Sequence, residues 1–307
     1  MLASLPAPFR IPLVVFLIAL NTVVHTLPLL VVALLKWLLP VPRLRDAFAG
    51  VLVRIAESWI AVNSGLIAVF TRTRFQVDGL PGLRPDGHYL VLCNHQSWVD
   101  IAMMQKVLNR RIPLLRFFLK SELIWVPLLG LAWWALDFPF MRRSTRKQLA
   151  KRPELAGKDI VATRRACEKF QGVPVSIMNF IEGTRFTDEK RARQASPYAR
   201  LLKPKAGGVG SVLNAMGGAL HSVIDVTIAY PGGTPSMLDL VAGRIPEVIF
   251  MIREREIPAD MRVSDYQQDA ASRVRLQRWL NSIWVEKDML LAQLLEEGRH
   301  DHRPPSE

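Results

Sequence analysis

The chain has 307 residues, of which 50% are hydrophobic and 22% are charged, so it is not a disordered protein and is long enough for one large domain or two small ones. Lysine and arginine outnumber aspartate and glutamate by 40 to 27, and the net charge of +13 favours an anionic partner. Nucleic acid, an anionic bilayer and a phosphorylated ligand all fit that charge, but the apolar N-terminus favours a bilayer. Two cysteines, Cys93 and Cys167, are too few for a disulfide framework.

The first expected element is a long apolar helix near the N-terminus. The stretch from Ile11 to Leu35 contains no lysine, arginine, aspartate or glutamate and, as a helix, is longer than a hydrocarbon core of ~30 Å. One kinked span or a re-entrant pair of short helices is expected, because polar residues and a proline lie in its middle, namely Asn21, Thr22, His25 and Pro28. A cleaved signal peptide ending near Ala47-Phe48-Ala49 is the less favoured alternative. A cytoplasmic location for the rest of the chain follows from the cations after the helix, Lys36, Arg43 and Arg45.

A second apolar helix is expected from Ala47 to Phe70, and strands and helices alternate after it. Strands are predicted at 75–80, 89–93, 114–119, 173–180, 223–230 and 248–252. Helices are predicted from Ser97 to Leu108, at 207–216 and at 274–295, and an apolar stretch with three tryptophans at 123–136. This order predicts an α/β fold, a mixed sheet flanked by helices, with an N-terminal membrane-anchoring helical segment. The expected division is 1–72 for the anchoring helices, 73–298 for the folded domain and 299–307 for a disordered tail.

A histidine and an aspartate follow the predicted strand that ends at Cys93, in the sequence Asn94-His95-Gln96-Ser97-Trp98-Val99-Asp100. An imidazole can take a proton from a hydroxyl at neutral pH, and a carboxylate can orient the ring and stabilise its charged form. The pairing requires His95 in the loop and Asp100 in the first helical turn, where Ser97 and Asp100 have the spacing of a capping box. By itself the spacing is weak, and a structural histidine fits it equally well. Cys93 is interpreted as a buried core thiol in preference to a nucleophile.

A second motif, Phe180-Ile181-Glu182-Gly183-Thr184-Arg185, follows a later strand. Gly183 permits a tight turn, and Arg185 can bind a phosphate through two hydrogen bonds with Thr184 as a further donor. Glu182 is expected to orient Arg185 or to bind a ligand hydroxyl; an ordinary charged turn is the alternative. Lys120, at the end of a predicted strand, is a further phosphate ligand or else a surface lysine. Basic residues cluster around these motifs at Arg142, Arg143, Arg146, Lys147, Lys190, Arg191, Arg193, Arg200, Lys203 and Lys205.

In this order the motifs resemble the four sequence blocks of the glycerolipid acyltransferase family that includes 1-acyl-glycerol-3-phosphate (lysophosphatidate) acyltransferases. The blocks are Asn94-His95-x4-Asp100, then Lys120-x2-Leu123-x3-Pro127-x2-Gly130 with Phe140 to Ser144, then Phe180 to Arg185, then Ile224 to Thr227. The segments 182–187 and 202–208 are similar to a subgroup with plant, animal and lysocardiolipin-type enzymes. The resemblance covers roughly Asp78 to Pro231 and implies that residues 73–298 form an acyltransferase domain.

The resemblance also implies roles for individual residues. His95 would remove the proton from an acceptor hydroxyl, Asp100 would orient His95, and the hydroxyl would attack an acyl thioester without an acyl-enzyme. The implied ligands of the acceptor's phosphate are Glu182, Gly183, Thr184, Arg185 and Arg143, with Arg142 and Lys120 as further candidates and Asn94 and Ser97 in support. Two positions depart from the family pattern. Arg142 replaces a common acidic residue, and Asp225 replaces a common proline, a change expected to bear on acyl-chain or acceptor choice.

The implied activity is transfer of a fatty acyl group from acyl-CoA or acyl-carrier protein to lysophosphatidate, giving phosphatidate, at the cytoplasmic face of the cell (inner) membrane. The stretch from Leu123 to Phe140 is expected to supply an apolar groove, and no metal or resident cofactor is expected. Another lysophospholipid or an ornithine lipid is an alternative acceptor. A non-catalytic protein that binds anionic lipid or nucleic acid is a second alternative. A hydrolase with Ser97 as nucleophile is a third, although no Gly-x-Ser-x-Gly elbow surrounds Ser97.

Overall fold

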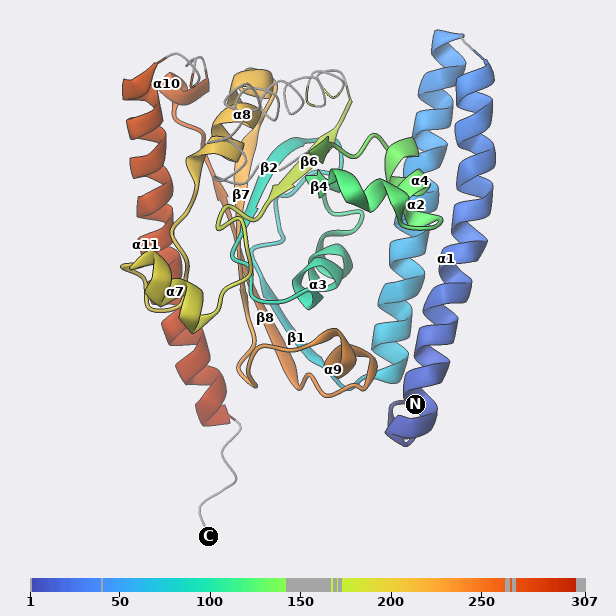
Figure 1. The fold of residues 1–307 in the computed structure, drawn as a ribbon, viewed down its shortest axis with the longest axis horizontal. Coiled ribbons are helices and arrows are strands. Elements are labelled where there is room, and N and C mark those ends of the chain that lie inside the picture. Colours follow the sequence, from blue (N-terminus) through green and yellow to red (C-terminus); the bar gives the residue numbers. More distant parts are fainter. Residues whose placement is uncertain are drawn as a thin grey trace.

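The computed structural model describes residues 2–39, 41–141, 173–262 and 269–301, together with Cys167, Phe170 and Tyr266. Two long N-terminal helices stand beside an α/β domain, and the sheet of that domain lies between these helices and the C-terminal helix (Figure 1). The predicted fold class, a mixed sheet flanked by helices, is confirmed.

The N-terminal helices α1 (Ala7–Leu38) and α2 (Pro42–Phe70) form an antiparallel hairpin. Both are long and apolar enough to cross a membrane, with a mean hydropathy of 2.2 and 1.4 in their most apolar windows. Because α1 continues through Pro28, the alternative of two short re-entrant helices is wrong. The polar residues in its middle face α2: Asn21 Nδ2 donates to Asn63 Oδ1 at 2.9 Å, and His25 Nε2 lies 3.1 Å from Ser58 Oγ. Such contacts are how polar side chains are accommodated between apolar helices in lipid.

The main sheet has six strands in the order β1-β8-β7-β2-β6-β3. Neighbouring strands are parallel except for β7 and β8, which are antiparallel. The strands are β1 (Arg74–Asp78), β2 (His88–Cys93), β3 (Leu115–Phe117), β6 (Val175–Asn179), β7 (Ser222–Ala229) and β8 (Glu247–Arg255). The strand predicted at 114–119 divides at Phe118, and its last residues form β4 (Leu119–Lys120), which pairs with β5 (Phe140–Met141) in a small second sheet.

Helices cover both faces of the main sheet, which explains why β7 is buried along its whole length. Ile224, Val226 and Ile228 pack on the face shared with α2 and α3 (Val99–Leu108). Val223 and Ala229 pack on the other face, with α8 (Ala206–Met216) and α11 (Ala270–Asp301). The remaining short helices are η1 (Leu2–Ser4), η2 (Ser121–Trp125), α4 (Leu129–Ala135), α7 (Asp188–Gln194), α9 (Met237–Val241) and α10 (Ala259–Arg262).

Asp225 lies on the face that α11 covers. Its buried carboxylate pairs with Lys287 Nζ at 2.6 Å and accepts a hydrogen bond from Arg255 Nε at 2.9 Å. Lys287, on α11, also donates to Thr227 Oγ1 at 3.1 Å. The expectation that Asp225 bears on acyl-chain or acceptor choice is therefore corrected. Alternation along β7 directs this side chain away from the face of α3, and it attaches α11 to the sheet.

The C-terminal boundary also differs from the prediction. Helix α11 continues to Asp301, so residues 299–301 extend the helix into the segment that was predicted as a disordered tail. Residues 302–307 of that tail lie outside the described residues.

Removal of Lys287 tests the buried ion pair. We expect Lys287→Met to lower the free energy of unfolding by about 3–5 kcal/mol, because the buried Asp225 carboxylate loses the nearer of its two cations. Arg253→Met is the matched control, since Arg253 is exposed and lies 3.7 Å from Glu286; its loss is expected to be below about 1 kcal/mol. Chemical denaturation in detergent measures both, and equal losses would contradict a special contribution of Lys287.

Candidate active site

The candidate site lies where two neighbouring parallel strands end. His95 follows β2, which ends at Cys93, and Glu182 follows β6, which ends at Asn179. The carboxyl edge of parallel strands is the usual place for a site in an α/β sheet. Asp100 lies in the first turn of α3 and His95 in the loop before it, the arrangement that the sequence analysis required for their contact.

The predicted contact between His95 and Asp100 is present. His95 Nδ1 lies 2.8 Å from Asp100 Oδ2, and the Asp100 side chain is 0% exposed. Because a carboxylate accepts, this geometry places a proton on Nδ1 and leaves Nε2 as the basic nitrogen of the neutral ring. Within the described part of the chain, no hydrogen bond to Nε2 is found, and the side chain is 13% exposed. The ring is therefore oriented and its basic nitrogen is available to a ligand.

Four donors hold the Asp100 carboxylate. Oδ2 accepts from the backbone N–H groups of Gln96 at 2.7 Å and Ser97 at 2.9 Å as well as from His95. Oδ1 accepts from the hydroxyl of Tyr230 at 2.7 Å. Burial and the adjacent carboxylate raise the pKa of Tyr230 well above its ordinary value, so this hydroxyl remains a donor at physiological pH. Tyr230 was missed by the sequence analysis; its place directly after β7, beyond the fourth block, was the only signal.

Glu182 holds the backbone of His95. Its carboxylate is 0% exposed; Oε1 accepts from His95 N–H and Oε2 from Leu202 N–H, each at 2.9 Å. Phe186 N–H in turn donates to the His95 carbonyl at 2.7 Å. The expectation that Glu182 binds phosphate, Arg185 or a ligand hydroxyl is wrong, because both oxygens are buried against backbone amides. Burial raises the pKa of Glu182 to about 7, although the two amides lower it.

The turn after Glu182 contains Arg185, and two lysines from elsewhere in the chain, Lys190 and Lys205, lie beside it. Gly183 has φ +72°, a left-handed conformation that favours glycine, and Lys205 Nζ lies 2.8 Å from where a Cβ would be. Lys190 Nζ donates to Thr184 Oγ1 at 3.0 Å and to the Arg185 carbonyl at 2.9 Å. The turn thus gathers cationic groups next to the residue that holds His95, as an anion site requires.

Two aromatic side chains orient the site. The His95 ring stacks on Phe180 with a centroid distance of 3.9 Å and an interplanar angle of 16°. Arg185 lies over Trp98, with Cζ 4.8 Å from the centre of that exposed ring. Trp98 was part of the motif, but no sequence pattern predicted its contact with Arg185. Stacking of this kind holds a guanidinium in one plane while its N–H groups remain able to donate.

The two supporting residues have structural contacts. Asn94 is fully buried and exchanges two hydrogen bonds of 2.9 Å with the backbone of Ile228, so it extends the pairing between β2 and β7. Ser97 Oγ donates to the Pro235 carbonyl and accepts from Val99 N–H at 3.1 Å. The expected capping box is therefore only half formed, because the hydroxyl is directed to Pro235. For the same reason Ser97 is not placed as a nucleophile for His95.

Other predicted residues are not brought to the turn. Lys120 is exposed at the end of β4, and no contact with Thr184 or Arg185 is found among the described residues. Arg142 and Arg143 lie outside the described residues. Cys93 is fully buried, and burial raises the pKa of its thiol well above the ordinary value, as expected for a core thiol. No cluster of three metal-binding side chains occurs in the described ranges.

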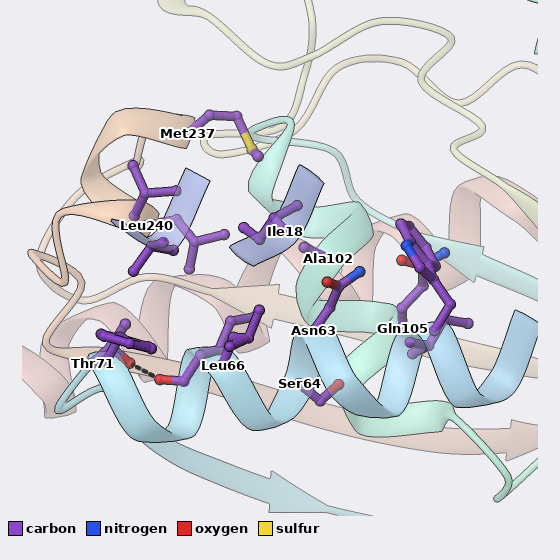
Figure 2. Close-up of a pocket in the computed structure, with 15 residues that line it drawn as sticks. Ile18, Asn63, Ser64, Leu66, Thr71, Ala102, Gln105, Met237 and Leu240 are labelled. Atoms are coloured by element: carbon purple, nitrogen blue, oxygen red, sulfur yellow. Dashed lines mark hydrogen bonds between the residues drawn. The ribbon is translucent and has the colours of Figure 1, made fainter. Parts of the chain in front are cut away.

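A separate apolar cavity of about 170 Å³ lies between the hairpin and the domain. Figure 2 shows Ile18 of α1, Leu66 of α2, Ala102 of α3 and Leu240 of α9 around it, with the amides of Asn63 and Gln105 on one wall. None of its lining residues comes from the stretch 123–140, which was expected to supply an apolar groove.

Comparison with known proteins agrees with the motifs. The model of a family described as Acyltransferase matches residues 74–231. The 1-acyl-sn-glycerol-3-phosphate acyltransferase gamma of Mus musculus is 26% identical over 225 residues, which cover 69% of this chain and 54% of the relative. Lysocardiolipin acyltransferase 1 of Gallus gallus is 24% identical over 260 residues, which cover 80% and 64%. The chain thus spans between about half and two thirds of the length of these relatives.

Among solved structures, the crystal structure of the 1-acyl-sn-glycerophosphate (LPA) acyltransferase PlsC from Thermotoga maritima has the same fold. The TM-score is 0.54 with 18% sequence identity, and the match covers 98% of this chain and 100% of that one. At this level of identity the likeness concerns the fold alone.

The titration of Glu182 predicts a pH-dependent stability. With a pKa of about 7 when folded and an ordinary value of 4.5, Glu182 binds more protons in the folded than in the unfolded state between these values. Its contribution is therefore full below pH 4.5 and is lost as the pH rises through 7. We expect the advantage of the wild type over Glu182→Gln, measured by chemical denaturation, to shrink by on the order of 3 kcal/mol from pH 5 to pH 8.

Glu189→Gln is the control for this comparison, because Glu189 is exposed on α7. Its difference from the wild type is expected to stay constant with pH. An advantage of wild-type Glu182 that is constant or grows between pH 5 and pH 8 would contradict the raised pKa.

Proposed function

Because the chain belongs to the glycerolipid acyltransferase family of the 1-acyl-glycerol-3-phosphate acyltransferases, we propose that it transfers a fatty acyl group from acyl-CoA or acyl-carrier protein to the free hydroxyl of lysophosphatidate, giving phosphatidate. The observation that carries this proposal is the His95–Asp100 pair next to a cationic turn. Glu182, at the start of that turn, accepts a hydrogen bond from the His95 backbone. A base beside a cationic turn suits an acceptor that carries both a hydroxyl and a phosphate, such as a phosphorylated lipid.

The proposed reaction needs one general base. The acceptor hydroxyl donates to His95 Nε2, and as its proton moves to the ring the oxygen attacks the thioester carbonyl. The tetrahedral intermediate collapses with cleavage of the carbon–sulfur bond, and the imidazolium returns the proton to the leaving sulfur. Ester and free thiol are the products. Asp100 stabilises the imidazolium while it exists, and its four donors keep the carboxylate in place.

The phosphate of the acceptor is assigned to the turn beside this base. Arg185, Lys190 and Lys205 converge on the segment from Gly183 to Arg185, and Trp98 holds the plane of the Arg185 guanidinium. A planar guanidinium binds two phosphate oxygens at once, whereas lysines add charge without fixing direction. The hydroxyl and the phosphate of one small headgroup can then bind to His95 and to the turn.

The hairpin is assigned to the cytoplasmic leaflet of the cell membrane. Helix α1, of 32 residues, is about 48 Å long, and the domain contacts it at both ends. Arg10 donates to the Ala242 carbonyl at the end of α9, and Lys36 pairs with Asp137 at the end of α4 at 3.4 Å. A bilayer that surrounded the hairpin along its length would enclose the domain as well. We therefore place the hairpin along one leaflet, in place of the transmembrane span that the sequence analysis allowed.

A second acceptor has specific support. Three relatives, from Gallus gallus, Danio rerio and Mus musculus, are lysocardiolipin acyltransferases, so another lysophospholipid is the alternative acceptor for the same chemistry. A hydrolase is disfavoured because the Ser97 hydroxyl is directed to Pro235.

Acyl transfer by the purified protein tests the proposal. With labelled acyl-CoA or acyl-carrier protein and a panel of lysophospholipids, we expect transfer to lysophosphatidate that falls by about 10²–10⁴ in His95→Ala, the usual contribution of a general base. His221→Ala is the matched control, because His221 lies at the opposite end of β7 and is expected to keep the activity. Transfer only to another lysolipid would show that the acceptor is that lipid and not lysophosphatidate. Transfer that survives in His95→Ala, or no transfer from either donor, would overturn the mechanism.

Tyr230→Phe tests the positioning of Asp100. Loss of a hydrogen bond to a charged group weakens its fixation by about 1.5–3 kcal/mol, so we expect kcat to fall about tenfold or more with little change in KM. Tyr266→Phe is the control, because it also removes a hydrogen bond of a buried tyrosine, to the Met261 carbonyl at 2.7 Å, away from the site. A similar loss of stability in both variants with a loss of kcat in neither would count against positioning by Tyr230.

A further inference from the structure

We propose that the segment of η2 and α4, residues 121–136, is a second membrane-contacting element, seated at the headgroup level of the bilayer that holds the hairpin. This inference rests on the membrane placement of the hairpin proposed above. It assigns one occupant, a lipid bilayer, to the exposed apolar surface of this segment.

Exposed apolar side chains on this segment are the first observation. Trp125 is 85% exposed, Trp134 is 55% exposed and Leu131 is 51% exposed. Leu131 and Trp134 are three residues apart on α4 and share a face, whereas Ala132 and Ala135 are buried in the core. The segment contains a single charge, Glu122. Tryptophan is enriched where a protein meets the boundary of headgroups and acyl chains, because its ring is apolar and its N–H is a donor.

Continuity with the hairpin is the second observation. Helix α4 packs on α1 and lies beside the hairpin in Figure 1. Lys36 of α1 pairs with Asp137, two residues after the end of α4. The neighbouring part of α1 presents an exposed apolar face that includes Trp37, itself 70% exposed. The apolar surface of α4 therefore adjoins that of α1. A bilayer that covers the hairpin there lies against α4 too.

The segment is held rigidly in this position. The buried Arg116 of β3 donates from Nε to the Leu136 carbonyl at the end of α4, at 3.1 Å. Gly130 of α4 lies so close to η2 that a Cβ would come 2.0 Å from the Ile124 carbonyl oxygen, which only glycine permits. Exposure of the tryptophans is thus a feature of a fixed element, not of a loose loop.

Aromatic packing links this segment to the candidate site. Phe138 follows α4, and its ring stacks with Phe117 at 6.5 Å; Phe117 stacks with Phe180 at 6.5 Å, and Phe180 with His95 at 3.9 Å. A row of rings therefore connects the proposed membrane contact to the catalytic imidazole.

Site-directed fluorescence tests the proposal on the full-length protein. Single cysteines are introduced by Trp125→Cys and Trp134→Cys and labelled with a polarity-sensitive dye; both native cysteines are buried and protected from the label. The labelled protein is bound to vesicles of phosphatidylcholine and phosphatidylglycerol that contain a spin-labelled lipid as quencher. Phe16→Cys, on the exposed face of α1, reports on the hairpin. Met289→Cys is the matched control, an exposed apolar position on α11.

We expect lipid quenching and a blue shift at positions 125, 134 and 16, and neither at 289. Quenching at 16 with positions 125 and 134 as exposed to water as 289 would overturn the second contact and leave the hairpin in the membrane. No quenching at 16 would overturn the placement of the hairpin and this inference with it.

A kinetic readout separates this inference from the proposed activity. In the double variant Trp125→Ser, Trp134→Ser, we expect KM for lysophosphatidate presented in vesicles to rise several-fold, with KM for a water-soluble short-chain lysophosphatidate unchanged. Equal effects on both substrates would overturn the membrane role of the two tryptophans. Absence of transfer by the wild type would instead count against the proposed function, which the quenching data do not depend on.

Discussion

The buried carboxylate of Asp100 is the group on which the arrangement of the site depends. An ionised carboxylate out of contact with water is costly unless its lone pairs are occupied, and here three donors besides His95 occupy them. Two of these donors are backbone amides of the loop that carries His95. The third, Tyr230, comes from the end of β7. Satisfying one charge therefore fixes the loop, the start of α3 and the exit of β7 relative to each other, and the imidazole acquires its orientation as a consequence.

Glu182 does for the backbone of His95 what Asp100 does for its ring. One buried carboxylate bridges the loops after β2 and β6 and the chain near Leu202, so the cationic turn cannot shift independently of the histidine. Burial raises the pKa of Glu182, and the hydrogen bonds from the Leu202 and His95 amides lower it, so the pKa is about 7. The site thus contains two buried acids with different tasks. The bridge keeps the turn next to His95, which suits the proposed acceptor, a small headgroup bearing both hydroxyl and phosphate.

Much of the fold, but only part of the site, could be predicted from the sequence. Period-2 and period-3.6 patterns and apolar runs located each main strand and the long helices, because those patterns reflect burial directly. The contact of His95 with Asp100 followed from loop and helix geometry. Tyr230 and the Asp225–Lys287 pair did not follow, because each depends on which face of β7 a residue occupies and on what packs there. Glu182 was misassigned, since a carboxylate in a polar turn gives no sign that both its oxygens are buried.

The contacts at the two ends of α1 decide how the domain and a membrane can be arranged. Arg10 and Lys36 each attach the helix to the domain, at α9 and α4 respectively, so in the proposed placement only the outer face of the hairpin meets lipid. A helix held to the domain at both ends cannot tilt away from it to cross a bilayer. Polar side chains of the two helices hydrogen-bond to each other between them, Asn21 to Asn63 and His25 to Ser58. The outer face is therefore left apolar. In the proposed placement, His95 stays at a constant depth relative to the lipid surface. A substrate anchored by its own acyl chain presents its headgroup at a constant depth as well. Matching the two depths replaces part of the search in solution by diffusion in two dimensions, so affinity for the headgroup alone need not be high.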